Sequence, residues 1–172
     1  MKNLFVICIL ILSVITINAQ EKKSKKEIKA EKKARQREEV KNIVDSKTFV
    51  FKASNANPMR GRTVNLTSEY DVKVTQDSIF SYLPYFGVAY SVNYGGTDSP
   101  MIFKNAFESC DFETTKNGYL VKVSVKNEND RLDYSFHISV TGSTSLNVSS
   151  LNRQSISYNG NIEKIKEKED KK

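Results

Sequence analysis

The side chains that could act as acids, bases or nucleophiles are few. His137 is the only histidine among 172 residues. Strand alternation places it with Asp133, Ser135 and Ser139 on a polar face, which favours a solvated side chain over a general base or a metal ligand. The sequence has no G-x-S-x-G elbow, no glycine-rich phosphate loop before a helix, and no metal-spaced His/Cys cluster. We therefore expect no cofactor and no bound metal, and a non-catalytic protein is favoured over an enzyme.

Acidic side chains leave one catalytic alternative open. Asp71, Asp77, Glu108 and Asp111 could meet in the folded chain as a pair of carboxyl groups, which is the arrangement that cleaves glycosidic bonds. No spacing favours that pairing over ordinary surface charge. The alternative is a carboxylate-dependent hydrolase acting on envelope or glycan polymers.

Arginine and aromatic side chains suggest binding instead of catalysis. Arg60 and Arg62 stand beside turn-forming residues and could hold a carboxylate or a phosphate. Five aromatic residues cluster around Pro84 and Gly87, where their rings could line a pocket or stack on sugar faces. These five are Tyr82, Tyr85, Phe86, Tyr90 and Tyr94.

A third candidate segment, residues 151–158, contributes Arg153. The alternative interpretation of all three segments is structural: the rings cap one end of the fold and the arginines bond to loop carbonyl groups. The predicted ligand is an unknown small molecule, a glycan or an envelope protein.

Four short sequence motifs, which include most of the candidate binding residues, resemble the motifs of a known family and follow the same order. They are residues 57–62 (NPMRGR), 81–87 (SYLPYFG), 94–96 (YGG) and 152–158 (NRQSISY). Together they resemble the domain of unknown function 4251, a family of small exported proteins from Bacteroidetes-type bacteria, over Val40 to Gly160. The resemblance implies an all-β domain and an exported location, and it implies no activity. In that setting Asp77-Ser78-Ile79 is similar to an O-glycosylation acceptor, which makes Ser78 a candidate modification site.

The first 19 residues have the form of a signal peptide. Lys2 provides the positive start, residues 4–17 form an apolar run, and Ala19 is a small residue suitable for cleavage. The run is too short for a comfortable membrane span, and Cys8 lacks the small residue that precedes a lipidated cysteine. We expect a protein of the periplasm, the outer envelope or the medium that is not lipid-anchored.

The positive charge is confined to the ends of the chain. Residues 20–46 form a charged helical arm; of these, 21–41 contain ten basic and five acidic residues. Residues 42–161 balance at eleven of each, and the flexible tail 162–172 adds a net charge of +1. This distribution predicts no nucleic-acid partner, although the arm could touch an anionic envelope surface.

Residues 47–161 predict one antiparallel β domain. Early strands are expected at 48–53, 63–66, 70–75, 78–82, 88–94 and near 101–103. A two-residue Asn117-Gly118 turn would pair Phe112 with Val123, Cys110 with Val125 and Glu113 with Lys122. A four-residue turn at 127–130 would pair Val125 with Leu132, Val123 with Tyr134, Val121 with Phe136 and Tyr119 with Ile138. A three-residue loop at 141–143 would pair Ile138 with Leu146 and Phe136 with Val148.

Such a meander must cover its apolar face. We therefore expect nine or ten strands that close as a barrel-like fold or a sandwich, with the barrel favoured. Cys110 is the only cysteine that remains after leader cleavage, so no internal disulfide can form, and the register places its thiol on the apolar face.

Overall fold

The computed structural model describes residues 24–90, 101–127 and 130–165. The predicted signal peptide and Tyr94 lie outside these ranges. The chain divides into two units, Met1–Lys33 and Ala34–Lys172, and the second holds all of the strands. No helix in the described ranges is both long and apolar enough to cross a membrane.

One helix precedes the strands, as predicted. Helix α2 spans Lys25–Asp45 and consists almost entirely of strong helix formers. Ser24 and Glu27 form a reciprocal cap: the Ser24 amide donates to Glu27 Oε2 at 2.8 Å, and the Glu27 amide donates to Ser24 Oγ at 3.3 Å. At the other end, Val40 and Val44 are buried in the core of the second unit.

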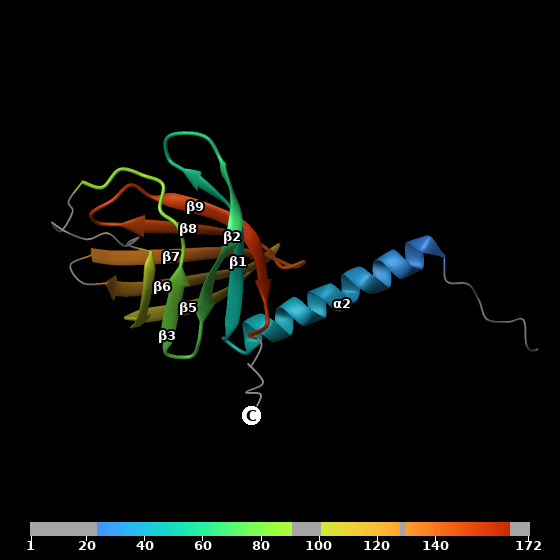
Figure 1. Cartoon of the computed structure of the whole chain (residues 1–172). Helices are drawn as coiled ribbons and strands as arrows, with labels where there is room; N and C mark the ends of the chain where they lie inside the picture. The colour runs from blue at the N-terminus through green and yellow to red at the C-terminus, as the bar shows by residue number, and fades with distance from the viewer. Residues whose placement is uncertain (1–23, 91–100, 128–129, 166–172) are drawn as a thin grey trace, which may run out of the picture. The chain divides into compact units, whose positions relative to one another are not determined.

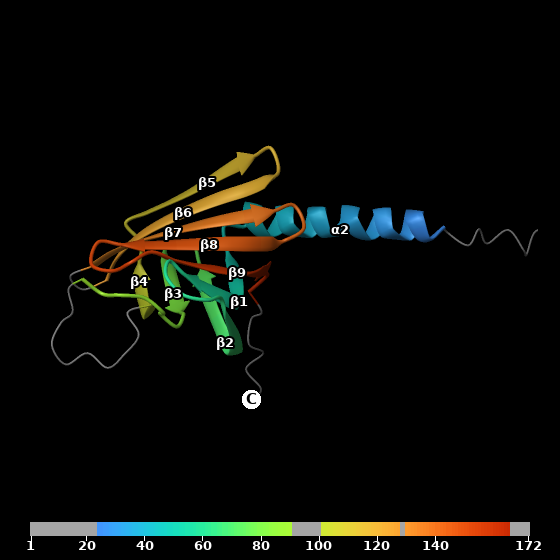
Figure 2. The ribbon, with the colours of Figure 1, turned by 90° about the horizontal axis from the view of Figure 1, so that it is seen from above.

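Nine antiparallel strands form a single curled sheet, a half-barrel (Figures 1 and 2). In space they run β4-β3-β2-β1-β9-β8-β7-β6-β5, so β4 and β5 are the two edges and the described strands do not close into a full barrel. The strand bounds are β1 Phe49–Pro58, β2 Val64–Val74, β3 Ser78–Tyr82, β4 Ile102–Ala106, β5 Ser109–Thr115, β6 Gly118–Asn127, β7 Asp130–Ser139, β8 Ser143–Ser150 and β9 Ile156–Glu163.

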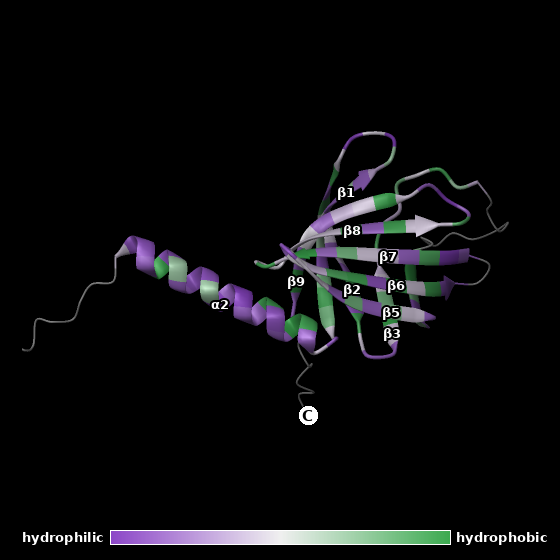
Figure 3. Ribbon diagram, turned by 180° about the vertical axis from the view of Figure 1, so that it is seen from behind, coloured by the Kyte–Doolittle hydropathy of each residue, from purple (hydrophilic) through white to green (hydrophobic). Residues whose placement is uncertain are grey.

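The concave side of the sheet is filled with large side chains. Alternation sends every second residue inward, and Figure 3 shows polar and apolar residues alternating along the strands. Phe136 lies at the centre, with ring centroids 5.2 Å from Phe49 and 5.9 Å from Phe51, both edge to face. Two buried tyrosines satisfy their hydroxyls inside the core: Tyr134 donates to Ser81 Oγ at 3.1 Å and Tyr158 donates to the Pro84 carbonyl at 2.7 Å.

The register of the β6–β7 hairpin is confirmed. Val125 faces Leu132 and Val121 faces Phe136, with the remaining predicted pairs also in place. All four of these side chains are buried. Burial fixes which face of each strand points inward, and the predicted turn position sets the pairing on that face.

The predicted register of the β5–β6 hairpin is wrong, because each β5 residue pairs two positions earlier on β6 than expected. The observed pairs are Phe112–Val121, Cys110–Val123 and Glu113–Leu120, with Lys116 and Asn117 as the turn. Gly118 is a strand residue, and a Cβ on it would lie 2.0 Å from the Ile138 carbonyl oxygen. Gly118 is therefore needed where two strands approach closely and not in the turn. The Asn-Gly pair, which usually marks a two-residue turn, predicted the wrong turn position for this reason. The expected ion pair still forms on a diagonal, with Lys122 Nζ 3.1 Å from Glu113 Oε1.

The β7–β8 loop has the predicted length but begins one residue earlier. Val140, Thr141 and Gly142 form it, so Phe136 faces Leu146 and Ile138 faces Thr144. The Gly142 amide donates to the Ser139 carbonyl at 3.0 Å, and Gly142 has a φ of +88°. A left-handed glycine in the third loop position is typical of three-residue hairpins.

Four of the early strands also differ from the prediction. The strands expected at 63–66 and 70–75 are parts of one continuous strand, β2 (Val64–Val74). The strand expected at 48–53 is longer, because β1 runs on to Pro58 through a bulge between Ala53 and Asn55. Of the strand expected at 88–94, the described part, Val88–Tyr90, forms only an isolated bridge from Ala89 to Arg153. Residues 78–82 form β3 as predicted.

Candidate functional site

Three connections meet at one end of the sheet, which we call the loop end. They are residues 59–63 between β1 and β2, residues 83–90 after β3, and residues 151–155 between β8 and β9 (Figure 1). Besides the Ala89–Arg153 bridge, the Tyr90 amide donates to the Asn152 carbonyl at 2.8 Å and the Gln154 amide donates to the Val88 carbonyl at 3.0 Å. The segment after β3 is therefore fixed along the β8–β9 loop.

Tyr85 anchors this arrangement. Its hydroxyl lies 2.9 Å from the Gln154 carbonyl oxygen and 3.2 Å from that of Val88, and it can donate to either. Burial raises the pKa of the Tyr85 phenol above its ordinary value, and the nearby Arg153 partly offsets that rise. Sequence reasoning treated Tyr85 as a pocket residue, whereas its polar atom is occupied by the backbone.

Arg153 is likewise engaged within the protein. Its Nε lies 3.7 Å from Asp130 Oδ2, and the two side chains are only 18% and 11% exposed. Asp130 also accepts hydrogen bonds from Ser150 Oγ at 2.7 Å and from the Leu151 amide at 3.2 Å. Arg153 Nε is buried and forms an ion pair but no hydrogen bond with the described residues. This cluster holds the β8–β9 loop against the start of β7.

Apolar side chains project from this fixed backbone into solvent. Phe86 is 36% exposed, Val88 54%, Tyr90 67% and Leu151 74%. We call these four residues the loop-end patch. Sequence analysis identified Phe86 and Tyr90 but missed Val88 and Leu151, because single aliphatic residues in a loop carry no signal of exposure.

The two predicted arginines lie on the neighbouring β1–β2 loop. Arg60 and Arg62 are both exposed, and neither forms an ion pair with a described residue. The loop is braced at its base, where Thr63 Oγ1 donates to Asn57 Oδ1 at 2.8 Å. The guanidinium groups are therefore free to meet an anionic group from outside.

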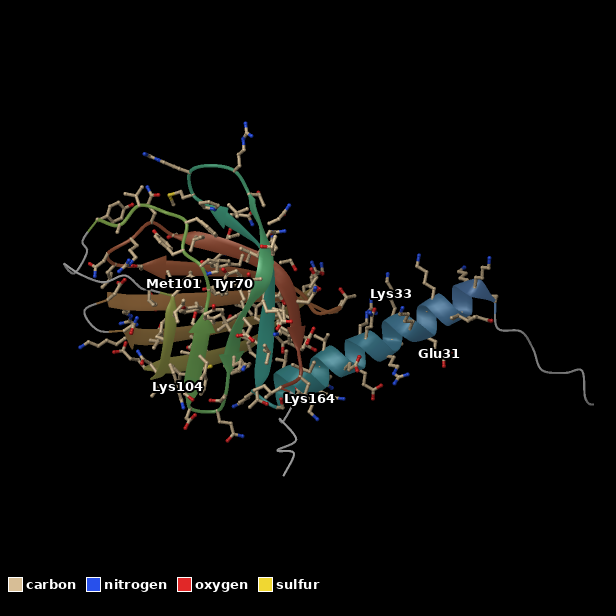
Figure 4. The ribbon with its side chains drawn as sticks, in the orientation of Figure 1. Glu31, Lys33, Tyr70, Met101, Lys104 and Lys164 are labelled. Atoms are coloured by element: carbon tan, nitrogen blue, oxygen red, sulfur yellow. The ribbon has the colours of Figure 1, made fainter. Side chains whose placement is uncertain are left out.

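Tyr82 lies apart from the other predicted rings. It is on β3, opposite Asp71 of β2, and stacks on Tyr70, which Figure 4 labels, with ring centroids 5.4 Å apart at 25°. Its side chain is about half exposed. The structure therefore brings together Tyr85, Phe86, Tyr90 and Arg153, and leaves Tyr82 on a separate surface.

The four carboxyl groups named as a possible catalytic pair have different surroundings. Asp71 Oδ2 lies 3.2 Å from Lys52 Nζ, and Glu108 Oε2 lies 3.8 Å from Arg131 Nη1. Asp111 is exposed on β5.

The fourth carboxyl group, Asp77, stands in the β2–β3 turn beside the candidate acceptor Ser78. Hydrogen bonds from Ser78 and then Thr75 lower the pKa of the Asp77 carboxyl. The Ser78 hydroxyl is half-buried and lies 2.8 Å from both Asp77 Oδ1 and Thr75 Oγ1.

The remaining reactive side chains are isolated. His137 is exposed on the convex face. Cys110 is half-buried against the core, and desolvation followed by the nearby Asp111 charge raises the pKa of its thiol from 9.0 to about 11. Among the described residues, no three His, Cys, Asp or Glu side chains gather where they could hold a metal ion.

These features define an all-β half-barrel domain with a preceding charged helix. The chain belongs to the family called domain of unknown function (DUF4251), whose model matches residues 31–162. The fold is similar to that of a DUF4251 family protein from Bacteroides eggerthii, with a TM-score of 0.55 and 16% identity, covering 76% of this chain and 89% of that one. No curated protein matches the sequence.

Proposed function

We propose that this protein is an exported, non-catalytic interaction module that binds a partner of the cell envelope through the loop-end patch. The observation that carries the proposal is the exposure of four apolar side chains, Phe86, Val88, Tyr90 and Leu151, on a backbone held by partly buried polar anchors. Exposed apolar groups gathered on a structured surface are typical of protein-binding sites. The export part of the proposal rests on the signal-like first 19 residues.

The anchoring of the patch supports a binding role. Ordering a loop on association costs free energy, and a loop that is already ordered avoids that cost. Tyr85 and the Arg153–Asp130 pair supply this order through partly buried polar groups. Arg60 and Arg62 on the adjacent loop would select a partner that carries an anionic group beside its apolar surface.

Two charge substitutions test the proposal. Val88→Glu and Leu151→Glu place carboxylates in the patch at exposed positions, so the fold should persist. Thr67→Glu, on an exposed position of β2, is the matched control. Each full-length protein would carry a photo-crosslinking amino acid at Tyr90 and be expressed in the producing bacterium.

The protein with the unmodified patch and the Thr67→Glu control should form the same crosslinked species. The Val88→Glu and Leu151→Glu variants should lose it. Circular dichroism would confirm that all of the proteins are folded. If crosslinks form equally in every protein, or in none, the loop-end patch is not the binding surface.

A further inference from the structure

The convex face of the sheet contains a groove that is separate from the loop-end patch. It has a volume of about 350 Å³ and extends over β9, β8 and β7 beside the base of the β1–β2 loop. One row of paired strand positions crosses it, from Asn57 through Ser157 and Asn147 to Ser135. A second row contributes Ser149 opposite Asp133.

The groove gathers several short polar side chains at neighbouring strand positions. Exposed strand faces favour β-branched and aromatic residues, whereas Asn and Asp are depleted there. Here Asn57, Asn147 and Asp133 occupy strand positions on three different strands. Exposed Asn and Asp also occur elsewhere on the described sheet, at Asn65, Asp111 and Asn159, so the groove is distinguished by the grouping of these side chains and not by their types.

The polar atoms of the groove are largely unused by the protein. The side chains of Ser135, Asn147 and Ser149 form no hydrogen bond with any described residue. Asp133 is held in place, because Ser124 Oγ donates to its Oδ1 and Arg131 Nε lies 3.5 Å from the same atom, yet its side chain remains 48% exposed. The groove therefore offers a fixed carboxylate beside free hydroxyl and amide groups.

The rim of the groove is apolar on one side. Pro58, the last residue of β1, and Met59, the first of the β1–β2 loop, line this side, and Met59 is 66% exposed. No described Lys, Arg or His lines the groove, and the Arg131 guanidinium that pairs with Asp133 is not among the lining residues.

We propose that this groove binds a saccharide. Sugar hydroxyls both donate and accept hydrogen bonds, as Ser and Asn side chains do, and a fixed carboxylate can accept from two neighbouring hydroxyls. The C–H face of a sugar ring would lie against Met59 and Pro58. A volume of about 350 Å³ is at the lower end of small-molecule sites and suits one or two sugar rings. This site goes beyond the proposed function and does not depend on the loop-end patch.

Asn147→Val tests the saccharide site. Valine suits an exposed strand position better than asparagine, so the variant should fold with equal or higher stability. Asn159→Val is the matched control, because Asn159 is exposed on β9 in the adjacent row and does not line the groove. Titrations of the full-length proteins by NMR would use neutral disaccharides, an N-acetylglucosamine disaccharide, a uronic-acid disaccharide and an unrelated tripeptide.

At least one neutral or N-acetylated sugar should bind at millimolar or lower concentration and shift the Asn147 side-chain amide. Its affinity should fall at least tenfold in Asn147→Val and remain within twofold in Asn159→Val. Val88→Glu should also bind normally, which separates this site from the patch. The proposal is wrong if no sugar binds, if the tripeptide binds equally well, or if both asparagine variants lose the same affinity.

Discussion

Replacing Asp130 by alanine should destabilise the protein more than replacing Arg153 by methionine. Asp130 accepts two hydrogen bonds, at 2.7 Å from Ser150 Oγ and at 3.2 Å from the Leu151 amide, whereas Arg153 Nε stands 3.7 Å away. Hydrogen bonds to a charged group contribute about 1.5–3 kcal/mol each, and water entering the gap will recover part of that, so Asp130→Ala should cost about 3 kcal/mol.

The arginine contributes less because its interaction is longer. Methionine retains the apolar stem of Arg153 and removes only an ion pair that is too long for a hydrogen bond. We therefore expect Arg153→Met to cost about 1 kcal/mol, with a coupling of about 1 kcal/mol or less in the double variant.

Thermal and urea unfolding followed by circular dichroism would measure these free energies. For a domain of this size, each kcal/mol lost from the free energy of unfolding lowers Tm by about 4 °C. Tm should therefore fall by about 12 °C in Asp130→Ala and by about 4 °C in Arg153→Met. Hydrogen exchange should accelerate at the amides of Tyr90 and Gln154, which bond across the loop end. Asp111→Ala, at an exposed position, is the control and should change stability by less than about 0.5 kcal/mol.

Two results would refute this reasoning. If Arg153→Met costs as much as Asp130→Ala, the ion pair and not the hydrogen bonds holds the loop. If Asp130→Ala matches the Asp111→Ala control, the cluster does not stabilise the loop end.

Three further changes test the fold. Gly118→Ala should cost more than about 2 kcal/mol in urea unfolding, because the new methyl group would lie 2.0 Å from the Ile138 carbonyl oxygen; an unchanged midpoint would contradict the β6–β7 packing. Phe136→Ala should cost about 3–5 kcal/mol through loss of a buried ring, and a smaller loss would mean that the core collapses around the gap. The pKa of the Cys110 thiol is raised to about 11, so a maleimide at pH 7.5 should label the folded protein about 100-fold more slowly than the protein unfolded in urea. The rate for the folded protein should rise about tenfold per pH unit. Equal rates in the folded and unfolded states would place the thiol in solvent.

The order of β5 to β8 follows from the sequence because short turns make each strand pair with the next. Burial then dictates which face of each strand points inward. Face alone cannot distinguish registers that differ by two residues, since such a shift returns every side chain to the same side. For β6–β7 both strands are buried along their length and the predicted alignment holds. For the β5–β6 hairpin the deciding residue was Gly118, and the sequence does not show whether a glycine serves a turn or a close contact.

The loop end was only partly predictable. The sequence identified Tyr85, Phe86, Tyr90 and Arg153 as candidate binding residues, but it did not indicate that their two segments lie side by side. Their roles differ because the backbone path of two loops decides which polar atoms find internal partners. The pairing of Asp130 with Arg153 joins the start of β7 to the β8–β9 loop, and no local pattern indicates it.

The packing of the concave side decides where this fold can bind anything. A curled sheet that holds a ligand inside must leave its interior partly empty, with side chains that surround a cavity. Here Phe49, Phe51, Tyr134, Phe136 and Tyr158 are all less than 2% exposed and fill that space. A ligand of the described domain would therefore have to bind on its outer surface. The loop-end patch and the convex groove are both on that outer surface, so substitutions there should separate binding from stability.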